Sequence, residues 1–143
     1  WPECSHVLPP NPPPAVMDLF IVEDSIPVRD RLVRTLEGLE GLDIVGTAED
    51  VTAAIAGLEN NHPDALILDL QLPSGSGLQV LRAVREKLPA MRVIVMTNFA
   101  AEPYRKAAMA AGAEVFLDKS AEFARVRDIL SEWRDQAGNR PLH

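Results

Sequence analysis

Cysteine, histidine and long apolar runs are all scarce in this chain of 143 residues. The single cysteine, Cys4, excludes an internal disulfide and predicts a reducing, cytoplasmic location. One cysteine and three scattered histidines argue against a structural zinc site. Charged residues interrupt every apolar run, so we expect no membrane-spanning segment, and the first residues lack the pattern of a signal peptide.

Basic residues are in the minority as well. Fourteen Lys and Arg against 21 Asp and Glu give a formal net charge of −7, which argues against nonspecific nucleic-acid binding by this segment. Solubility alone is a sufficient explanation for that charge. The apolar fraction of 47% is enough for a packed core, and the length fits one domain.

Proline is concentrated at the N-terminal end. Six of the twelve prolines lie in residues 1–15, where no helix or strand period is visible. We therefore predict a disordered tail over residues 1–15, with docking to a proline-binding module as an alternative. The folded domain is predicted over residues 16–135, and a C-terminal tail or linker over residues 136–143.

Short apolar runs alternate with segments of helical period through the rest of the chain. The runs lack alternation, which predicts strands buried on both faces. They are Leu19–Val22, Asp43–Gly46, Ala65–Leu68, Val93–Met96 and Val115–Leu117. Five such alternations predict an α/β, flavodoxin-like three-layer sandwich, with a five-stranded parallel sheet in the order 2-1-3-4-5 and five helices.

The helical segments each have one apolar face. These faces are formed by Leu32, Val33, Leu36 and Leu39; by Ala54, Ile55 and Leu58; by Leu78, Leu81, Val84 and Leu88; by Ala107, Ala108 and Ala111; and by Phe123, Val126, Ile129, Leu130 and Trp133. Pro103 is expected in the first turn of the fourth helix, where its missing N–H costs little.

Polar residues follow four of the five strands, at the end of the sheet where ligands bind in open parallel folds. Glu23 and Asp24 follow the first strand, Asp69 the third, Thr97 the fourth and Lys119 the fifth. Three converging carboxylates call for a cation, and an all-oxygen site on a solvated rim suits Mg²⁺. With the lysine and the hydroxyl, the group could cradle a phosphoryl group, and Asp69 would be the nucleophile.

Each residue alone has a simpler interpretation. A single Asp at a strand end usually caps a helix or turn, and Thr97 alone would do the same. Lys119 alone would be a solvated surface charge, and Phe116 alone would be part of the core. The combination of four strands with matching chemistry favours the functional interpretation.

Four motifs occur in a fixed order, and together they resemble the receiver domain of bacterial two-component response regulators over residues 17–134. The motifs are Phe20-Ile21-Val22-Glu23-Asp24, then Leu68-Asp69-Leu70-Gln71-Leu72-Pro73 with Gly77, then Val95-Met96-Thr97, then Gly112-Ala113 through Phe116-Leu117-Asp118-Lys119. The resemblance implies that Asp69 is the phosphoacceptor, supplied by a histidine kinase, a phosphotransfer protein or a small acyl phosphate.

The resemblance also assigns roles to the surrounding residues. It implies that Mg²⁺ is held by Glu23, Asp24, Asp69 and the backbone carbonyl of Gln71. It implies that Thr97 and Lys119 bind the phosphoryl oxygens, and that Phe116 is a switch aromatic that turns inward when Thr97 moves. Such a module catalyses only its own phosphorylation and dephosphorylation.

Three positions depart from the commonest family pattern. Ser120 stands where proline is frequent in the family, and a serine at this position resembles receivers that carry helix-turn-helix output domains. The absence of proline leaves open whether the Lys119–Ser120 bond is cis or trans. Asn98 stands where a smaller residue is usual. Phe99 occupies a position that tunes phosphoryl lifetime in the family, where we expect it to shield the acyl phosphate from water.

Rival interpretations fit less well. The stretch from Gly41 to Thr47 has the glycine spacing of a P-loop but no lysine, and Val80 stands where a Gly-rich dinucleotide loop needs its third glycine. A haloacid dehalogenase-type phosphatase needs a second aspartate at position 71, where Gln71 stands. A receiver-like interaction module that is never phosphorylated remains as the alternative function.

The output surface is predicted at the fourth helix, the fifth strand and the fifth helix, which border Thr97 and Phe116. Outward charges there favour phosphorylation-dependent homodimers, although any one charge could simply solvate the helix. These charges are Glu122, Arg125, Arg127 and Asp128. No DNA-binding motif lies within the sequence, but an output domain that binds DNA could follow Gln136.

Overall fold

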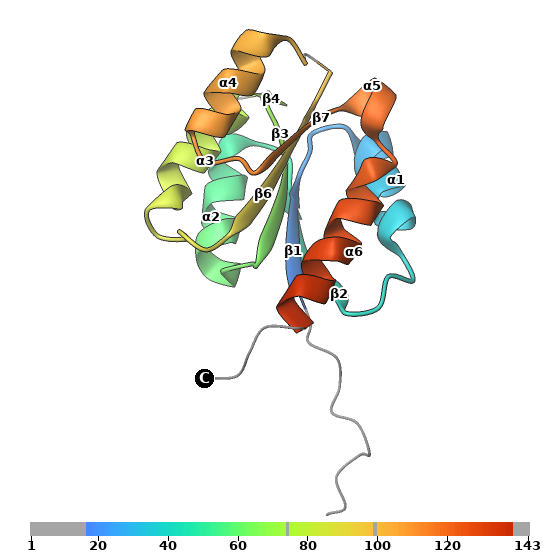
Figure 1. Cartoon of the computed structure of the whole chain (residues 1–143). Coiled ribbons are helices and arrows are strands. Elements are labelled where there is room, and N and C mark those ends of the chain that lie inside the picture. Colours follow the sequence, from blue (N-terminus) through green and yellow to red (C-terminus); the bar gives the residue numbers. More distant parts are fainter. Residues whose placement is uncertain (1–16, 74, 99, 139–143) are drawn as a thin grey trace, which may run out of the picture.

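Five parallel strands form the central sheet of the computed structural model, which describes residues 17–73, 75–98 and 100–138 (Figure 1). The strand order is β2-β1-β3-β6-β7, which confirms the predicted order 2-1-3-4-5. The strands are β1 (Met17–Val22), β2 (Leu42–Ala48), β3 (Ala65–Asp69), β6 (Arg92–Thr97) and β7 (Val115–Asp118). The predicted tail over residues 1–15 lies outside the described residues, as does Phe99.

Helices cover both faces of the sheet, so the three-layer prediction is confirmed (Figure 1). One face carries α1 (Ile26–Leu36) and α6 (Arg125–Gly138), and the other carries α2 (Val51–Asn61), α3 (Gly77–Arg85) and α4 (Glu102–Ala110). The fifth predicted helix is divided, because a short helix α5 (Lys119–Glu122) precedes α6. The helix α6 continues to Gly138, into the segment predicted as a C-terminal tail or linker.

The two edge strands are less buried than the sequence predicts. Of the seven residues of β2, only Ala48 is buried, and of the four residues of β7 only Leu117 is. Apolar runs in β2 and β7 look like those of central strands, but an edge strand has one neighbour and incomplete helix cover. The prediction of burial on both faces is therefore wrong for these two strands, whereas all of β3 is buried.

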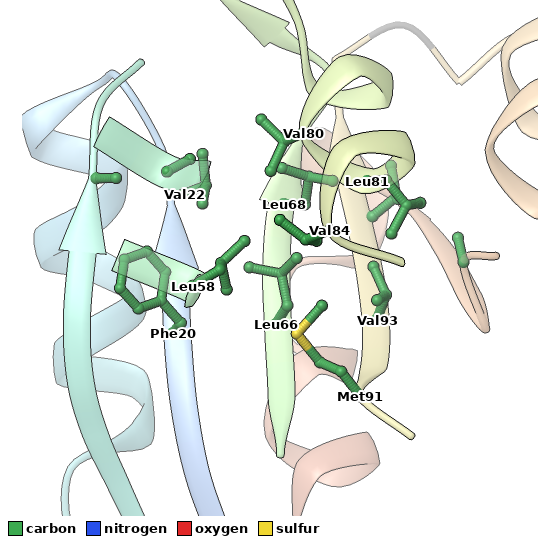
Figure 2. Packing of buried hydrophobic residues seen from close by; sticks show 14 of the residues in the cluster. Phe20, Val22, Leu58, Leu66, Leu68, Val80, Leu81, Val84, Met91 and Val93 are labelled. Carbon is green, nitrogen blue, oxygen red and sulfur yellow. The ribbon is translucent and has the colours of Figure 1, made fainter. Parts of the chain in front are cut away.

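Phe20 fills a space that two glycines leave open beside β1. A Cβ built on Gly57 of α2 would lie 2.4 Å from the Phe20 ring, and one on Gly46 of β2 would lie 2.6 Å from it. The register of β1 against β2 shifts between Leu19 and Phe20, so that Phe20 pairs with Gly46. In Figure 2, Phe20 lies in the same cluster of buried side chains as Leu58, on the face covered by α2 and α3.

Local capping explains where several helices begin. Ser25 caps α1 by accepting from the amide of Val28, and Asp50 caps α2 by accepting from the amide of Ala53. Ser76 caps α3 in a reciprocal capping box with Gln79. The helix α4 has no side-chain cap, but Pro103 lies in its first turn, as predicted.

A two-stranded hairpin that was not predicted from the sequence lies between β3 and α3. It consists of β4 (Gln71–Leu72) and β5 (Gly75–Ser76), and the two strands are antiparallel. Strands of two residues are too short to leave a periodic signal in the sequence. The hairpin begins two residues after Asp69 and therefore adjoins the candidate site.

Arginine side chains fasten the helix α6 to the last turn of α1 and to the loop after it. Arg127 donates to the carbonyl oxygen of Thr35 at 2.6 Å, and Arg134 donates to that of Glu40 at 2.7 Å. The prediction that Arg127 faces outward is wrong, because backbone carbonyls at the end of α1 attract its guanidinium. Within the described part of the chain, no helix has the length and apolarity needed to cross a membrane.

Candidate functional site

Three carboxylates meet at the carboxyl ends of the two central strands, as predicted. Glu23 and Asp24 follow β1, and Asp69 ends β3, which pairs directly with β1. One ligand atom from each lies within 4.8 Å of the others. The carboxylates open into a cavity of about 280 Å³. It is lined by Glu23, Asp24, Ser25, Val28, Asp69, Gln71, Asn98 and Lys119.

Lys119 is the counter-charge of this cluster. It is the first residue of α5, directly after β7, and only 9% of it is exposed. Its Nζ lies 2.6 Å from Oε1 of Glu23 and 2.8 Å from Oδ2 of Asp69. Burial lowers the pKa of Lys119, but the hydrogen bonds to Asp69 and Glu23 outweigh it, so the net shift is upward and the amine stays charged.

Glu23 is held at both oxygens. While Oε1 pairs with Lys119, Oε2 accepts a hydrogen bond of 3.0 Å from the backbone amide of Ser25. Burial is the main cause that raises the pKa of Glu23 to about 7, against the lowering effect of the lysine and the amide. The role of Ser25 was not found from the sequence, where a serine before a helix signals only a cap.

Asp69 is also held at both oxygens. Oδ2 accepts from Lys119, and Oδ1 accepts from the backbone amide of Gln71 at 3.1 Å. The side chain is 6% exposed, and it faces the cavity rather than a helix terminus. The simpler interpretation of Asp69 as a helix cap therefore fails. That role belongs to Asp118, which accepts from the amide of Ser120 at the start of α5.

The cluster fits a divalent cation. Three carboxylates against one ammonium group leave an excess of negative charge in a partly buried site. Asp24 is exposed, so the cavity has an entrance lined by an anionic oxygen. An all-oxygen donor set that keeps access to water is the kind of site that suits Mg²⁺.

Thr97 lies next to this cavity rather than in its wall. It is fully buried at the end of β6 and lines a neighbouring cavity of about 390 Å³ with Leu70, Gln71 and Tyr104. Gln71 borders both cavities. Phe116 is half-buried on β7 and packs against the core cluster that contains Ala108 of α4. The Lys119–Ser120 bond is trans.

The fold and the site together define an α/β module of the flavodoxin-like kind, with an acidic, lysine-containing cavity at the switch point of its sheet. Residues 19–131 match the family model of the response regulator receiver domain, and the chain belongs to that family.

Individual relatives agree with this assignment. The chain is 32% identical over 118 residues to the DNA-binding transcriptional activator DevR/DosR of Mycobacterium tuberculosis, covering 80% of this chain and 54% of the relative. It is 36% identical over 112 residues to the photosynthetic apparatus regulatory protein RegA of Rhodobacter capsulatus, covering 78% and 60%. The chain thus spans little more than half the length of these curated relatives.

The fold also matches solved structures. The response regulator domain of Thermotoga maritima CheB superimposes with a TM-score of 0.74 at 27% identity, covering 89% of this chain and 99% of that domain. The receiver domain of a LuxO repressor protein from Vibrio parahaemolyticus gives a TM-score of 0.76 at 27% identity, covering 85% and 92%.

Proposed function

We propose that this chain accepts a phosphoryl group on Asp69 and signals by changing conformation. The observation that carries the proposal is the position of the Asp69 carboxylate. It is buried at the switch point, paired with Lys119 at 2.8 Å, and close to two further carboxylates. Asp69 is thus a fixed nucleophile beside a fixed positive charge, which is what phosphoryl transfer requires of a protein.

We propose that Mg²⁺ is the cation of the site, held by Glu23, Asp24, Asp69 and the backbone carbonyl of Gln71. A bound Mg²⁺ would neutralise charge on the phosphoryl oxygens. Because Mg²⁺ dehydrates reluctantly and has few protein ligands here, we expect a dissociation constant in roughly the millimolar range. Asp24→Ala should abolish binding, and unchanged NMR shifts around Ser25 on adding Mg²⁺ to the wild type would contradict the site.

The transfer step exchanges one bond to phosphorus for another. A carboxylate oxygen of Asp69 forms a bond to phosphorus as the bond to the donor breaks. The donor is the imidazole nitrogen of a kinase phosphohistidine or the carboxyl oxygen of an acyl phosphate. The imidazole leaves with a proton from solvent, and the acyl group leaves as a carboxylate. Lys119 offsets the charge that the phosphoryl group brings, and the Thr97 hydroxyl donates to one of its oxygens.

The conformational response begins at Thr97. A hydrogen bond to the new phosphoryl group draws Thr97 toward Asp69, and the space it leaves beside β7 admits the ring of Phe116. The surface that changes is formed by α4, β7 and the α5–α6 segment. We propose that this surface supports self-association on phosphorylation, through the charges of Glu122, Arg125 and Asp128.

The chain would catalyse only its own phosphorylation and dephosphorylation. Its phosphoryl donor would be a sensor histidine kinase or a phosphotransfer protein in the cytoplasm. Two of the relatives named above have regulatory names, and one is called DNA-binding. We propose by analogy that a longer form of this protein couples the receiver to a DNA-binding output domain, and that the receiver itself does not contact DNA.

The test is phosphorylation by acetyl phosphate, followed by intact mass. The wild type with Mg²⁺ should gain one phosphoryl group, whereas chelation of the metal or the substitution Asp69→Asn should prevent the gain. Asp69→Asn hardly changes the side-chain volume, so its circular dichroism should match that of the wild type. A wild type that never gains a phosphoryl group would instead support the alternative, an interaction module that is not phosphorylated.

A further inference from the structure

We infer that Gly77, the first residue of α3, is a positioning residue for phosphoryl transfer to Asp69. The inference rests on the proposed function of Asp69 as phosphoacceptor. Gly77 has no side chain, and this absence lets the first turn of α3 pack directly on the backbone of the nucleophile. Ser76, the residue before Gly77, pairs with Gln71, which lines the acidic cavity together with Asp69.

The contact between Gly77 and Asp69 is closer than any side chain would allow. A Cβ built on Gly77 would lie 2.2 Å from the carbonyl oxygen of Asp69, 3.0 Å from its carbonyl carbon and 3.1 Å from Cα of Leu70. The amide of Gly77 donates to the carbonyl oxygen of Leu70 at 2.8 Å. Gly77 is buried, so the helix start is fixed against the chain that carries the nucleophile.

The hairpin β4–β5 transmits this constraint to the backbone amide of Gln71, which donates a hydrogen bond to Asp69. Gln71 pairs with Ser76, the residue directly before Gly77. Ser76 is itself fixed by the capping box, since its amide donates to Oε1 of Gln79 at 2.8 Å and its hydroxyl accepts from Leu78 at 3.1 Å. The amide of Gln71 can then donate to Oδ1 of Asp69 at 3.1 Å. Hairpin and helix start therefore hold Oδ1 of Asp69, while Lys119 holds Oδ2.

An added methyl group at position 77 must move something in this arrangement. Real Cβ atoms essentially never approach another heavy atom within 3.0 Å, and the atom in the way is backbone rather than the end of a flexible side chain. The required shift is therefore roughly 1 Å, which is the scale of misplacement that costs about a hundredfold in a positioned reaction. We expect Gly77→Ala to slow phosphorylation of Asp69 by about tenfold to a hundredfold.

A matched control separates positioning from a general loss of stability. Gly57 of α2 has a similarly close contact, because a Cβ there would lie 2.4 Å from the ring of Phe20. That contact lies in the core between α2 and β1, and Gly57 does not line the acidic cavity. Gly57→Ala should therefore lower the melting temperature without changing the phosphorylation rate of the folded protein.

The experiment measures two quantities for the wild type, Gly77→Ala and Gly57→Ala, at a temperature where circular dichroism shows all three folded. The first is the phosphorylation rate at saturating acetyl phosphate, and the second is the Mg²⁺ dissociation constant from NMR titration. Gly77→Ala should slow the rate and weaken Mg²⁺ binding several-fold, while Gly57→Ala should match the wild type in both. Wild-type values for Gly77→Ala would overturn the inference and leave the proposed function intact. A wild type that is not phosphorylated would overturn both.

A second pair of variants tests the same constraint without a new clash. Gln79→Ala removes the acceptor that holds the Ser76 amide, and Gln79→Glu keeps an acceptor at that place. Gln79 is exposed, so neither change should prevent folding. Phosphorylation of the Gln79→Ala variant should be several-fold slower than that of the wild type, and the Gln79→Glu variant should be phosphorylated at the wild-type rate. If Gly77→Ala does not fold, this pair decides, and equal rates for both Gln79 variants and the wild type would overturn the inference.

Discussion

Lys119 is the residue whose environment most constrains the chemistry of the site. Its Nζ is shared between Glu23 and Asp69, and the side chain is nearly as buried as its two partners. Burying an ion pair of this kind costs desolvation free energy, and loss of one partner strongly destabilises the folded protein because it leaves the other charge buried and unpaired. Under the proposed function, the lysine keeps the two carboxylates together in the unphosphorylated protein and binds the oxygens of the phosphoryl group once it is on Asp69.

Replacement of this lysine should have opposite effects on metal binding and on phosphorylation. Lys119→Met leaves the carboxylates without a counter-charge, so we expect a loss of about 3 kcal/mol in the free energy of unfolding without metal. Mg²⁺ should then bind more tightly than in the wild type, because no cation competes for the oxygens, while phosphorylation slows. Urea unfolding with and without Mg²⁺ measures the loss of stability and the gain in Mg²⁺ binding, with the exposed Lys106→Met as control. Equal Mg²⁺ stabilisation of Lys119→Met and wild type would contradict the role given to the lysine.

Glu114, which lies far from the site, makes a pH-dependent contribution to the free energy of unfolding. Its hydrogen bonds to Arg92 hold the pKa of the carboxyl below its usual value of 4.5, and Arg92 also stacks 4.2 Å from the ring centroid of Trp133. Because the pKa of Glu114 is lower in the folded than in the unfolded protein, its ion pair stabilises the fold fully at a pH above the unfolded-state pKa. This stabilisation is lost as the pH falls through the folded-state pKa. The side chain is 43% exposed, so the pair is worth at most about 1 kcal/mol.

The expected result for Glu114→Gln follows from that sign. The variant should be less stable than the wild type at pH 7, by a few tenths to about 1 kcal/mol, and the gap should shrink as the pH falls below about 4.5. Urea unfolding at several pH values measures the gap. Glu59 forms another surface ion pair, with Lys87, and Glu59→Gln serves as the control. A gap that widens toward acid would show that the sign is wrong.

At the scale of elements, helix packing depends on a few close contacts that composition does not reveal. One of these is the close contact between the ring of Phe20 and Gly57 of α2. Gly57→Ala gains about 1 kcal/mol of helix propensity, but overpacking a core costs about 1–3 kcal/mol. Because an added Cβ would lie 2.4 Å from an aromatic ring, the overpacking cost exceeds the gain. The net effect should be destabilising.

A double-mutant cycle tests this assignment. Phe20→Leu removes the ring that an alanine at position 57 would meet, so the second change should cost less in that background than in the wild type. Thermal unfolding of the four proteins gives the coupling free energy between Phe20 and Gly57. Additive changes, with no coupling, would contradict the packing described here.

The elements that the sequence predicted are those long enough to show either an unbroken apolar run or a helical period. The strand order followed from five alternations, and the acid cluster from where β1 and β3 end. The hairpin β4–β5 was missed because two-residue strands have no period. The break between α5 and α6 was missed because Phe123 and Val126 lie on one apolar stripe that continues across it. The edge strands were misjudged because burial depends on neighbours, which one segment does not encode.

The site could be predicted only at the level of which side chains gather. That Glu23, Asp24, Asp69 and Lys119 meet followed from strand ends alone. The backbone amides that orient them, from Ser25 and Gln71, have no residue-type signature, since every residue except proline carries one. The position of Thr97 in a neighbouring cavity likewise depends on the hairpin, which the sequence did not predict.

At the scale of the whole molecule, the helices α4 and α6 differ in how firmly they are attached. The helix α6 is tied to the last turn of α1 by Arg127 and to the loop after α1 by Arg134. By contrast, Ala108 is the only fully buried residue of α4, and Tyr104 and Met109 of that helix are among the exposed large apolar residues of the described chain. A helix with little buried surface is the easier one to displace.

This difference leads to a prediction about assembly. With Mg²⁺ and beryllofluoride, a mimic of the phosphoryl group, we expect the chain to self-associate through the surface of α4, β7 and α5–α6. Sedimentation velocity with and without the mimic measures it, and Arg125→Glu should weaken the association by reversing an exposed charge. A monomer under both conditions would exclude the dimer, and hydrogen exchange that changes only around α1 would contradict the surface.

The central claim is that Asp69 carries the phosphoryl group, and chemical mapping tests it most directly. Borohydride reduces an aspartyl phosphate to homoserine, so the modified residue can be located by peptide mass spectrometry after treatment with acetyl phosphate and Mg²⁺. The account predicts homoserine at position 69 alone. Homoserine at position 24, or no homoserine in a protein that is folded and saturated with Mg²⁺, would contradict it.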